Sequence, residues 1–277
     1  MRYLIIGNGY IGNYLKNKLP DAEIYKEKIN PGCRTNATQA LVRYGGFNPV
    51  VINCAGKTGR PNIDWCESNK TETFNANVLL PLDLAKACEK FGMQMIHIGS
   101  GCIYTGYAKE YTEDDSPNFY DSYYSRTKAI SQELLEEFNN VTTLRVRMPI
   151  DETLGERNYI TKVVGYAMKD YPMMVLQNSM TWLDDLVRLI EFIAKFHIVG
   201  TFNAVNDGSM SPIDILKLWK EYRDPELTWR RVGYQQVRET LSAGRSNCIL
   251  STEKLKKIGF EVNHIDHFVK PLIKDGK

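Results

Sequence analysis

The sequence lacks a long apolar run. No segment approaches the roughly 20 consecutive apolar residues that a membrane-spanning helix needs. The first residues, 1–6, read as a strand and lack the basic, apolar and small-residue succession of a secretory signal peptide. We therefore expect a cytoplasmic protein that does not enter a membrane.

An excess of either charge is also lacking. The 35 Lys and Arg residues against 33 Asp and Glu residues leave a formal charge of +2, so no attraction to nucleic acid or to a membrane surface is expected. The six cysteines include no CxxC pair and form no regular framework. This pattern argues against a metal site or a disulfide scaffold and favours a reducing compartment.

What is present is an ordinary globular composition. With 43% hydrophobic and 25% charged residues, a chain of 277 residues has enough length for one large domain or one and a half. Amphipathic stretches at residues 74–91 and 124–138 predict helices. Strand alternating with helix predicts an α/β fold with a Rossmann-type, doubly wound parallel sheet. Strands are expected at residues 3–6, 50–53, 95–98 and 143–146, where short apolar runs are typical of strands buried on both faces of a sheet.

After Pro149 the pattern changes to short elements punctuated by Gly and Pro. We interpret residues 1–150 as a dinucleotide-binding Rossmann domain and residues 151–277 as a smaller, mainly substrate-binding portion. Within the second portion we expect helices at residues 158–169 and 183–196 and a strand at residues 201–205.

A glycine pattern follows the first predicted strand, where Gly7, Gly9 and Gly12 are spaced as G-x-G-x-x-G. Glycines at these positions permit a tight turn, close approach of the backbone to a pyrophosphate, and packing of the next helix on the sheet. The N-terminus of that helix then faces the phosphates. Residues 53–56, which read NCAG after another strand, predict a second loop at the cofactor. The candidate cofactor-binding residues are Gly7, Asn8, Gly9, Tyr10, Ile11, Gly12, Arg34, Ala55, Gly56, Lys57, Tyr124, Lys128 and Pro149.

The region after the second predicted strand bears on the choice of cofactor. An NAD enzyme is expected to carry an acidic residue about 20 residues after the glycine pattern, where it binds the ribose. Here the sequence carries Lys26, Glu27 and Lys28, and Arg34 follows. The basic side chains suit a 2′-phosphate and favour NADPH, whereas Glu27 leaves NADH open.

Three residues predict a reduction catalyst. Tyr124 and Lys128 are four residues apart, so on a helix they project from one face. A nearby ammonium lowers the pKa of a phenol, and such a tyrosine can donate its proton to a carbonyl oxygen while Ser100 polarises the same oxygen. Tyr123 is a competitor by adjacency, but the residue four positions beyond it is Thr127.

Cys102 follows Ser100 by two residues, so in extended chain both side chains point the same way. A thiolate there could remove a proton next to the substrate carbonyl. The alternative is a small buried hydrophobe, which is how a free cysteine usually behaves.

The order of these segments resembles the extended short-chain dehydrogenase/reductase superfamily. A narrower resemblance is to the bifunctional nucleotide-rhamnose synthase/epimerase-reductases of plants, which are similar to bacterial dTDP-4-dehydrorhamnose reductases. It runs over most of the chain. The motifs that carry it include GKTGRPNIDWCES at 56–68, GCI at 101–103, PNF at 117–119, LRVRMPI at 144–150, NSMT at 178–181 and RSN at 245–247.

The resemblance implies both a 3,5-epimerisation and a 4-keto reduction that together convert UDP-4-keto-6-deoxy-D-glucose into UDP-L-rhamnose. By the same resemblance, Cys102 and Lys162 form the acid-base pair of the epimerisation, and a homodimer is expected. A separate 4,6-dehydratase must supply the keto sugar, since no second glycine fingerprint is present. The candidate substrate-binding residues are Arg60, Asn62, Ser100, Asn178, Met180 and Arg245.

Two other functions remain open. A reductase that acts on an already epimerised 4-keto sugar needs neither Cys102 nor Lys162. A non-catalytic cofactor-binding regulatory subunit need not keep Ser100, Tyr124 and Lys128, and the presence of all three argues against it.

Overall fold

The computed structural model describes residues 1–32 and 34–275 and has a six-stranded parallel sheet at its centre. The strand order is β2-β1-β3-β4-β5-β9. This confirms the predicted α/β, doubly wound fold. The order reverses between β1 and β3, which is where such sheets bind ligands outside the carboxyl ends of the strands. The strands are β1 (Tyr3–Ile6), β2 (Ala22–Ile24), β3 (Val50–Asn53), β4 (Met95–Ser100), β5 (Val141–Val146) and β9 (Gly200–Phe202).

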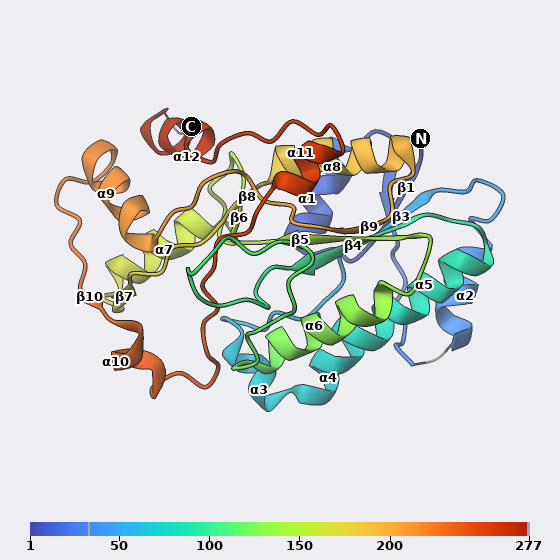
Figure 1. Cartoon of the computed structure of the whole chain (residues 1–277), viewed down its shortest axis with the longest axis horizontal. Helices are drawn as coiled ribbons and strands as arrows, with labels where there is room; N and C mark the ends of the chain where they lie inside the picture. The colour runs from blue at the N-terminus through green and yellow to red at the C-terminus, as the bar shows by residue number, and fades with distance from the viewer. Residues whose placement is uncertain (33, 276–277) are drawn as a thin grey trace.

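Helices cover both faces of this sheet (Figure 1). Because successive strand residues point to opposite faces, Ile5 belongs to one hydrophobic cluster and Leu4 to the other. One face carries α1 (Tyr10–Lys18), α8 (Leu183–Phe196) and α11 (Glu253–Lys257). The opposite face carries α2 (Arg34–Val42), α3 (Asp64–Ser68), α4 (Lys70–Phe74), η1 (Asn75–Leu79), α5 (Leu80–Lys90) and α6 (Tyr123–Leu135).

A smaller portion extends from one end of the sheet, at the left of Figure 1. It has its own hydrophobic cluster, which includes Ile160, Met180 and Val269. Its elements are two short parallel strand pairs and four helices: β6 (Pro149–Ile150) with β8 (Thr181–Trp182), β7 (Met173–Met174) with β10 (Arg231–Val232), and α7 (Tyr159–Met168), α9 (Pro212–Tyr222), α10 (Tyr234–Arg238) and α12 (Asp266–Asp275).

Two expected elements differ in the structure. The helix expected at residues 74–91 continues directly from α4, which begins at Lys70, and its backbone widens to a π-helix over Asn75–Leu79 before α5. The strand expected at residues 201–205 ends at Phe202. The cause is the next residue, since the backbone N–H of Asn203 donates to the Glu113 carboxylate at 2.7 Å instead of extending the ladder. The helix expected at residues 183–196 is α8, with the same bounds.

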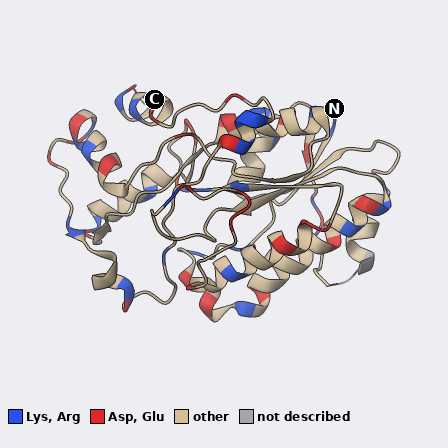
Figure 2. Cartoon of the chain, in the orientation of Figure 1, with Lys and Arg blue, Asp and Glu red and all other residues tan. Residues whose placement is uncertain are grey.

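Charge is distributed over the molecule without a dominant sign. Figure 2 shows basic and acidic residues interspersed along the helices of both faces. Within residues 1–32 and 34–275, no helix is both long enough and apolar enough to cross a bilayer.

Candidate active site

The glycine loop between β1 and α1 has the shape of a phosphate cradle. Gly7 has a φ of 108°, and a Cβ added to it would lie 2.6 Å from the amide nitrogen of Ala55. A Cβ on Gly12 would lie 2.1 Å from the carbonyl oxygen of Gly7, whereas a Cβ on Gly9 would meet nothing within 4 Å. Two glycines therefore permit close packing of the loop, and the third leaves open space at the N-terminus of α1.

The other candidate cofactor-binding residues in and near this loop have different surroundings. Tyr10 and Ile11 pack against the hydrophobic cluster beneath α1 and anchor its first turn. Asn8 is exposed. Glu27, the possible ribose ligand of an NAD enzyme, pairs with Arg43 at 2.6 Å. The side chain of Arg34 lies outside the described residues.

Asn77 organises the second cofactor loop. Its Oδ1 accepts the backbone N–H of Lys57 at 2.7 Å, and its Nδ2 donates to the Lys57 carbonyl at 3.0 Å and to Thr127 Oγ1 at 3.1 Å. A Cβ on Gly56 would lie 3.1 Å from Asn77 Oδ1 and 3.8 Å from Lys128 Nζ. The loop, the π-helical segment and α6 therefore meet at one buried amide. Sequence reasoning missed Asn77, because only the fold brings it to this loop.

A buried histidine supports the same loop. Asn53 Nδ2 lies 3.1 Å from His97 Nδ1, and Asn53 Oδ1 accepts the N–H of Ala55 at 3.1 Å. Burial, with a further contribution from Lys128, lowers the pKa of His97 well below its ordinary value. The imidazole is therefore neutral at pH 7 and can accept from Asn53 without placing a second positive charge beside Lys128.

Ser100, at the end of β4, and the two α6 residues Tyr124 and Lys128 are all buried. Lys128 Nζ donates to the carbonyl of Ile98 at 3.2 Å, and burial lowers the pKa of Lys128 to about 8. We expected a lowered pKa for Tyr124, and this was wrong. Burial and the neighbouring Cys102 raise the pKa of Tyr124, and these effects outweigh the lowering by a hydrogen bond with Ser100. The phenol is thus held in its protonated form.

The N-terminus of α6 is fixed by side chains from two places. Ser122 is the N-cap and accepts the backbone N–H of Ser125 at 3.0 Å. Glu67, on α3, accepts the backbone N–H of Tyr123 at 2.5 Å. The ring of Tyr123 lies against the Lys70 ammonium, 5.7 Å from ring centroid to nitrogen. The two adjacent tyrosines therefore have different surroundings, and Tyr124 is the one that interacts with Ser100.

Cys102 lies close to Ser100 and Tyr124, as expected, but its backbone geometry differs from the prediction. The strand ends at Ser100 and the chain turns at residues 101–103, so the extended geometry assumed for Cys102 is wrong. Instead, the turn lets the Cys102 N–H donate to Ser100 Oγ at 3.1 Å. The thiol is partly exposed and interacts electrostatically with Tyr124 and Lys128.

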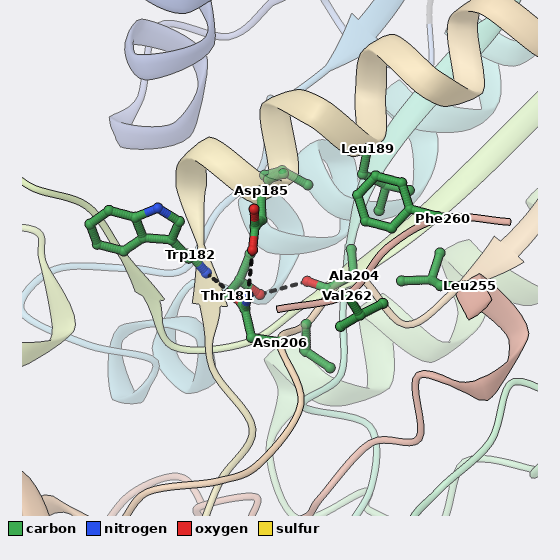
Figure 3. Close-up of a pocket in the computed structure, with 11 residues that line it drawn as sticks. Thr181, Trp182, Asp185, Leu189, Ala204, Asn206, Leu255, Phe260 and Val262 are labelled. Carbon is green, nitrogen blue, oxygen red and sulfur yellow. Dashed lines mark hydrogen bonds between the residues drawn. The ribbon is translucent and has the colours of Figure 1, made fainter. Parts of the chain in front are cut away.

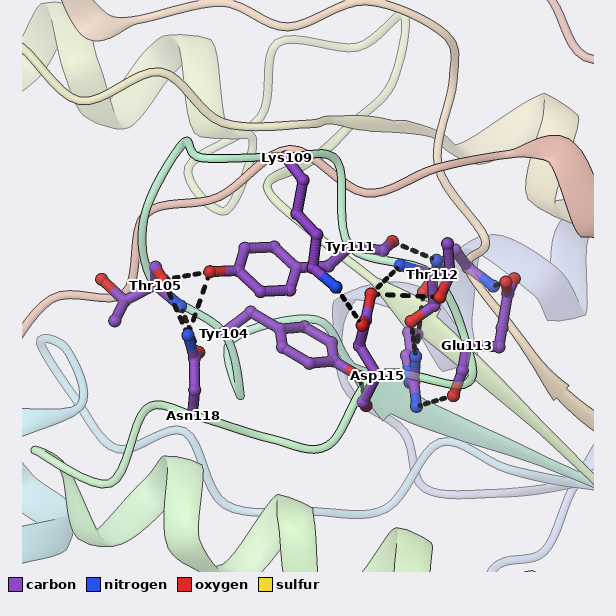
Figure 4. A network of polar contacts seen from close by, with 10 residues as sticks. Tyr104, Thr105, Lys109, Tyr111, Thr112, Glu113, Asp115 and Asn118 are labelled. Carbon is purple, nitrogen blue, oxygen red and sulfur yellow. Dashed lines mark hydrogen bonds and ion pairs between the residues drawn. The ribbon is translucent and has the colours of Figure 1, made fainter.

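The loop that leads from Cys102 to α6 is held by a dense polar network (Figure 4). The Thr105 carbonyl accepts from Tyr111 Oη at 2.5 Å and from Asn118 Nδ2 at 3.0 Å. Tyr104 and Tyr111 stack with ring centroids 4.6 Å apart, and the Tyr104 hydroxyl donates to the Asp115 carbonyl at 2.7 Å. These contacts fix the connection between Cys102 and the start of α6.

Arg147 is a buried residue that we did not single out from the sequence, although it is part of the LRVRMPI motif. Its Nη1 donates to the Gly101 carbonyl at 2.9 Å and to Ser246 Oγ at 3.0 Å, and its Nη2 donates to Asn178 Oδ1. Asn178, a predicted substrate ligand, is 2% exposed and engaged in this internal network. The predicted ligand Met180 is fully buried in the cluster of the smaller portion.

The remaining candidates lie on the segments around the site. Arg245 forms a two-point ion pair with Asp64, with nitrogen to oxygen distances of 3.0 and 2.8 Å. Asn62 Oδ1 accepts the N–H of Asp64 at 2.8 Å at the start of α3, and Arg60 is exposed. The substrate contacts of these residues stay predictions.

Lys162 and Pro149 lie at the smaller portion. Pro149 begins β6, directly beyond β5. Lys162 lies on α7 and is partly buried, and burial together with Arg157 lowers its pKa. No hydrogen bond joins Lys162 to Cys102 within the part of the chain that the structure describes. Tyr159, one turn earlier on α7, does interact electrostatically with Cys102.

Figure 3 shows a small pocket beside α8. Its polar groups are satisfied internally, because Asn206 Nδ2 donates to the Asp185 carboxylate at 2.7 Å and Thr181 Oγ1 donates to the Ala204 carbonyl at 2.7 Å. None of the predicted site residues lines it, so we assign it to packing between α8 and the C-terminal segment. Its lining is Thr181, Trp182, Asp185, Leu186, Leu189, Ala204, Val205, Asn206, Leu255, Phe260 and Val262.

Comparison with known proteins identifies the family of the chain. The model of the RmlD substrate binding domain matches residues 1–276. The chain belongs to this family. It is 38% identical over 264 residues to a bifunctional dTDP-4-dehydrorhamnose 3,5-epimerase/dTDP-4-dehydrorhamnose reductase of Arabidopsis thaliana, an alignment that covers 92% of this chain and 86% of the relative.

Two further relatives extend this RmlD-type assignment. A trifunctional UDP-glucose 4,6-dehydratase/UDP-4-keto-6-deoxy-D-glucose 3,5-epimerase/UDP-4-keto-L-rhamnose-reductase of Arabidopsis thaliana is 39% identical over 267 residues, which are 93% of this chain but only 39% of that protein. The chain therefore spans about two fifths of the length of that relative. The crystal structure of the L780 UDP-rhamnose synthase of Acanthamoeba polyphaga mimivirus has a TM-score of 0.89 at 30% identity, with 99% of both chains covered.

Proposed function

We propose that this RmlD-type chain epimerises UDP-4-keto-6-deoxy-D-glucose at C3 and C5 and reduces its C4 ketone with NADPH, so that UDP-L-rhamnose is formed. The observation that carries the proposal is the meeting of a partly exposed thiol, Cys102, with Ser100, Tyr124 and Lys128 at the end of β4. Of the two proposed activities, the reduction is named as a reductase activity in both Arabidopsis thaliana relatives.

The glycine loop fits a dinucleotide. Gly7 and Gly12 pack too closely for any side chain, and Gly9 faces open space at the start of α1, where a pyrophosphate would lie. When bound, NADPH supplies the hydride for C4. We propose NADPH rather than NADH because Glu27 is already paired with Arg43, while Lys26 and Lys28 are exposed beside it.

In the reduction, Tyr124 is the proton donor to the C4 oxygen. Its raised pKa keeps the phenol protonated until negative charge develops on that oxygen. Ser100 interacts with the Tyr124 hydroxyl and so can donate to the same oxygen. Lys128, one helical turn further along α6, is proposed to hold the cofactor and to supply positive charge near the site.

In the epimerisation, Cys102 is the base. The C3 and C5 protons are both acidified by the C4 ketone, and the electron pair of the broken C–H bond moves to the C4 oxygen, which Ser100 and Tyr124 stabilise. Lys162 is the proposed acid that returns a proton on the opposite face. Its lowered pKa makes the ammonium a better donor, which supports this role.

Two partners belong to the proposal. The keto sugar is proposed to come from a 4,6-dehydratase, an activity that the name of the trifunctional relative includes. We also propose a homodimer through α6, because Ile130 and Leu134 lie one turn apart on that helix and are 40% and 37% exposed.

The test is incubation of the purified chain with UDP-4-keto-6-deoxy-D-glucose and NADPH in heavy water, with NMR and mass analysis of the sugar. The expected product is UDP-L-rhamnose with deuterium at C3 and C5. Reduction without deuterium incorporation would contradict the epimerase activity and leave a 4-keto reductase. Absence of any turnover would leave a cofactor-binding subunit.

A further inference from the structure

Arg147 is a buried cation without a carboxylate partner. Its side chain is 1% exposed, and its guanidinium donates only to neutral groups: the Gly101 carbonyl, Ser246 and the Asn178 amide oxygen. None of the ion pairs among residues 1–32 and 34–275 includes it. Its Nε has no hydrogen-bond partner in the same part of the chain.

Arg145 is a second buried arginine in this fold, and its charge environment differs from that of Arg147. It lies two residues earlier on β5 and is also fully buried. The carboxylates of Glu113 and Glu136 are among its strongest electrostatic neighbours. Its charge is therefore compensated by acids that are ionised at pH 7, whereas the charge of Arg147 is not.

The strongest electrostatic neighbours of Arg147 are two thiols and two phenols: Cys102, Cys248, Tyr159 and Tyr107. These acids are largely neutral at pH 7 in water. Because a buried charge without a counter-charge is costly, the arrangement suggests that one neighbouring acid, or a bound anion, supplies the negative charge when the protein acts.

The position of the Arg147 guanidinium indicates which of these neighbours its charge acts on. Arg147 Nη1 donates to the carbonyl of Gly101, the peptide group that joins Gly101 to Cys102, at 2.9 Å. A Cβ on Gly101 would lie 2.9 Å from Arg147 Cγ and 2.5 Å from Leu250 Cδ1, so only glycine lets the arginine stem lie over this turn. The charge is thus fixed directly behind the residue that carries the thiol.

Cys248 is a poor candidate for the ionised group. It is fully buried, its Sγ donates to the Gly101 carbonyl at 3.6 Å, and burial raises its pKa to about 11. Cys102 is partly exposed and faces the site that holds Ser100 and Tyr124. Of the two thiols, only Cys102 can reach a substrate.

We propose that Arg147 is a positioning residue of the epimerisation, whose fixed charge stabilises the thiolate of Cys102. The inference rests on the proposed function. In the step it serves, the Cys102 sulfur takes a proton from C3 or C5, an S–H bond forms, and the C–H electron pair moves to the C4 oxygen. A proton from Lys162 forms the new C–H bond on the other face, so nothing is oxidised or reduced.

The test measures the rate at which iodoacetamide alkylates Cys102 at pH 7, resolved from the other cysteines by peptide mass analysis. Arg147→Met is expected to slow alkylation of Cys102 about tenfold or more, since the thiolate is the reacting form. Arg147→Lys, which keeps the charge, is expected to restore most of the rate. Cys54 serves as the internal reference, and its alkylation is expected to be the same in all three proteins.

Equal rates in the wild type and Arg147→Met would overturn the inference, as would a Lys variant as slow as the Met variant. If Arg147→Met does not fold, the native wild type is compared with the same chain unfolded in urea. Cys102 is expected to react faster in the native state, and a slower reaction there contradicts the proposal.

The outcome is separable from that of the proposed function. Deuterium incorporation at C3 and C5 with alkylation that is indifferent to Arg147 would remove this inference alone. Absence of deuterium incorporation with alkylation that depends on Arg147 would remove the epimerase activity and leave an activated thiolate at this position.

Discussion

Asn77 forms two hydrogen bonds with the backbone of Lys57, accepting its N–H at 2.7 Å and donating to its carbonyl at 3.0 Å. One side chain thereby satisfies both backbone groups of a residue in the loop that follows β3. Because Asn77 is fully buried, this pairing fixes the path of the loop beside Lys128.

Replacing Asn77 with Ala is expected to weaken cofactor binding. Losing the partners of both backbone groups costs about 1–3 kcal/mol, which corresponds to a rise of about 5- to 150-fold in the KM for NADPH. Steady-state kinetics with each substrate varied in turn checks this. Thr127→Val removes one of the three contacts, leaves the loop pairing intact, and should change the KM for NADPH much less.

Tyr124→Phe is expected to lower the rate of ketone reduction by about 10²–10⁴-fold, because the proton donor is lost. The matched control is Tyr123→Phe, which removes a hydroxyl from the adjacent tyrosine beside Lys70. Single-turnover oxidation of NADPH, followed by absorbance, measures the effect. Equal losses in the two variants would show that Tyr124 is not the donor.

Cys102→Ala is expected to abolish deuterium incorporation at C3 and C5, with a fall of at least about 10²-fold in the exchange rate. Reduction of separately prepared UDP-4-keto-L-rhamnose should fall by much less, because that substrate needs no base. The two rates are measured by NMR and by NADPH oxidation on the same preparation. Unchanged exchange in the Ala variant would assign the base elsewhere.

The lowered pKa of Lys128 predicts a pH dependence of stability. Its folded-state pKa of about 8 lies below the ordinary value of 10.5, so the unfolded chain binds more protons between these two values. The free energy of unfolding from this group therefore rises as the pH increases from about 8 towards 10.5, by about 1–3 kcal/mol. Urea unfolding at about pH 8 and at about pH 10.5, the two ends of this window, measures the rise.

The variant Lys128→Met isolates this contribution. It lacks the titrating ammonium, so its free energy of unfolding should rise less over the same pH interval than that of the wild type. If both proteins show the same change, burial of Lys128 is not the cause.

Arg245→Ala separates a substrate contact from a structural ion pair. If Arg245 binds the nucleotide diphosphate, the variant raises the KM for the nucleotide sugar about tenfold or more without changing the KM for NADPH. Asp64→Asn removes the partner of Arg245 but leaves the guanidinium in place, and is the control. Thermal melts of both variants report the structural part, since each breaks the same pair.

The features that depend on local sequence patterns could be predicted from the sequence alone. The strands β1, β3, β4 and β5 follow from short apolar runs, and α8 follows from its regular apolar spacing, so these elements were predicted with little error. The glycine loop was predictable because its constraint is steric and acts between residues close in the chain or on adjacent strands, as at Gly7 and Gly12.

The rest depended on contacts between distant segments. The π-helical widening at Asn75–Leu79 and the contact of Asn77 with Lys57 arise only when η1 packs on the second loop. The end of β9 is set by Glu113, 90 positions from Asn203. Likewise, the raised pKa of Tyr124 comes from burial, which the spacing of Tyr124 and Lys128 does not encode.

The path of the chain limits how the protein can be divided. The chain leaves the sheet after Val146, returns to it for α8 and β9, leaves again, and returns a second time for α11, whose Leu255 packs in the cluster of the sheet. A truncation at residue 150 would therefore uncover the edge of β5 and remove one wall of the core. Fragment complementation or domain exchange between relatives would have to join the chain at several points at once, so we expect this fold to vary by substitution more readily than by recombination.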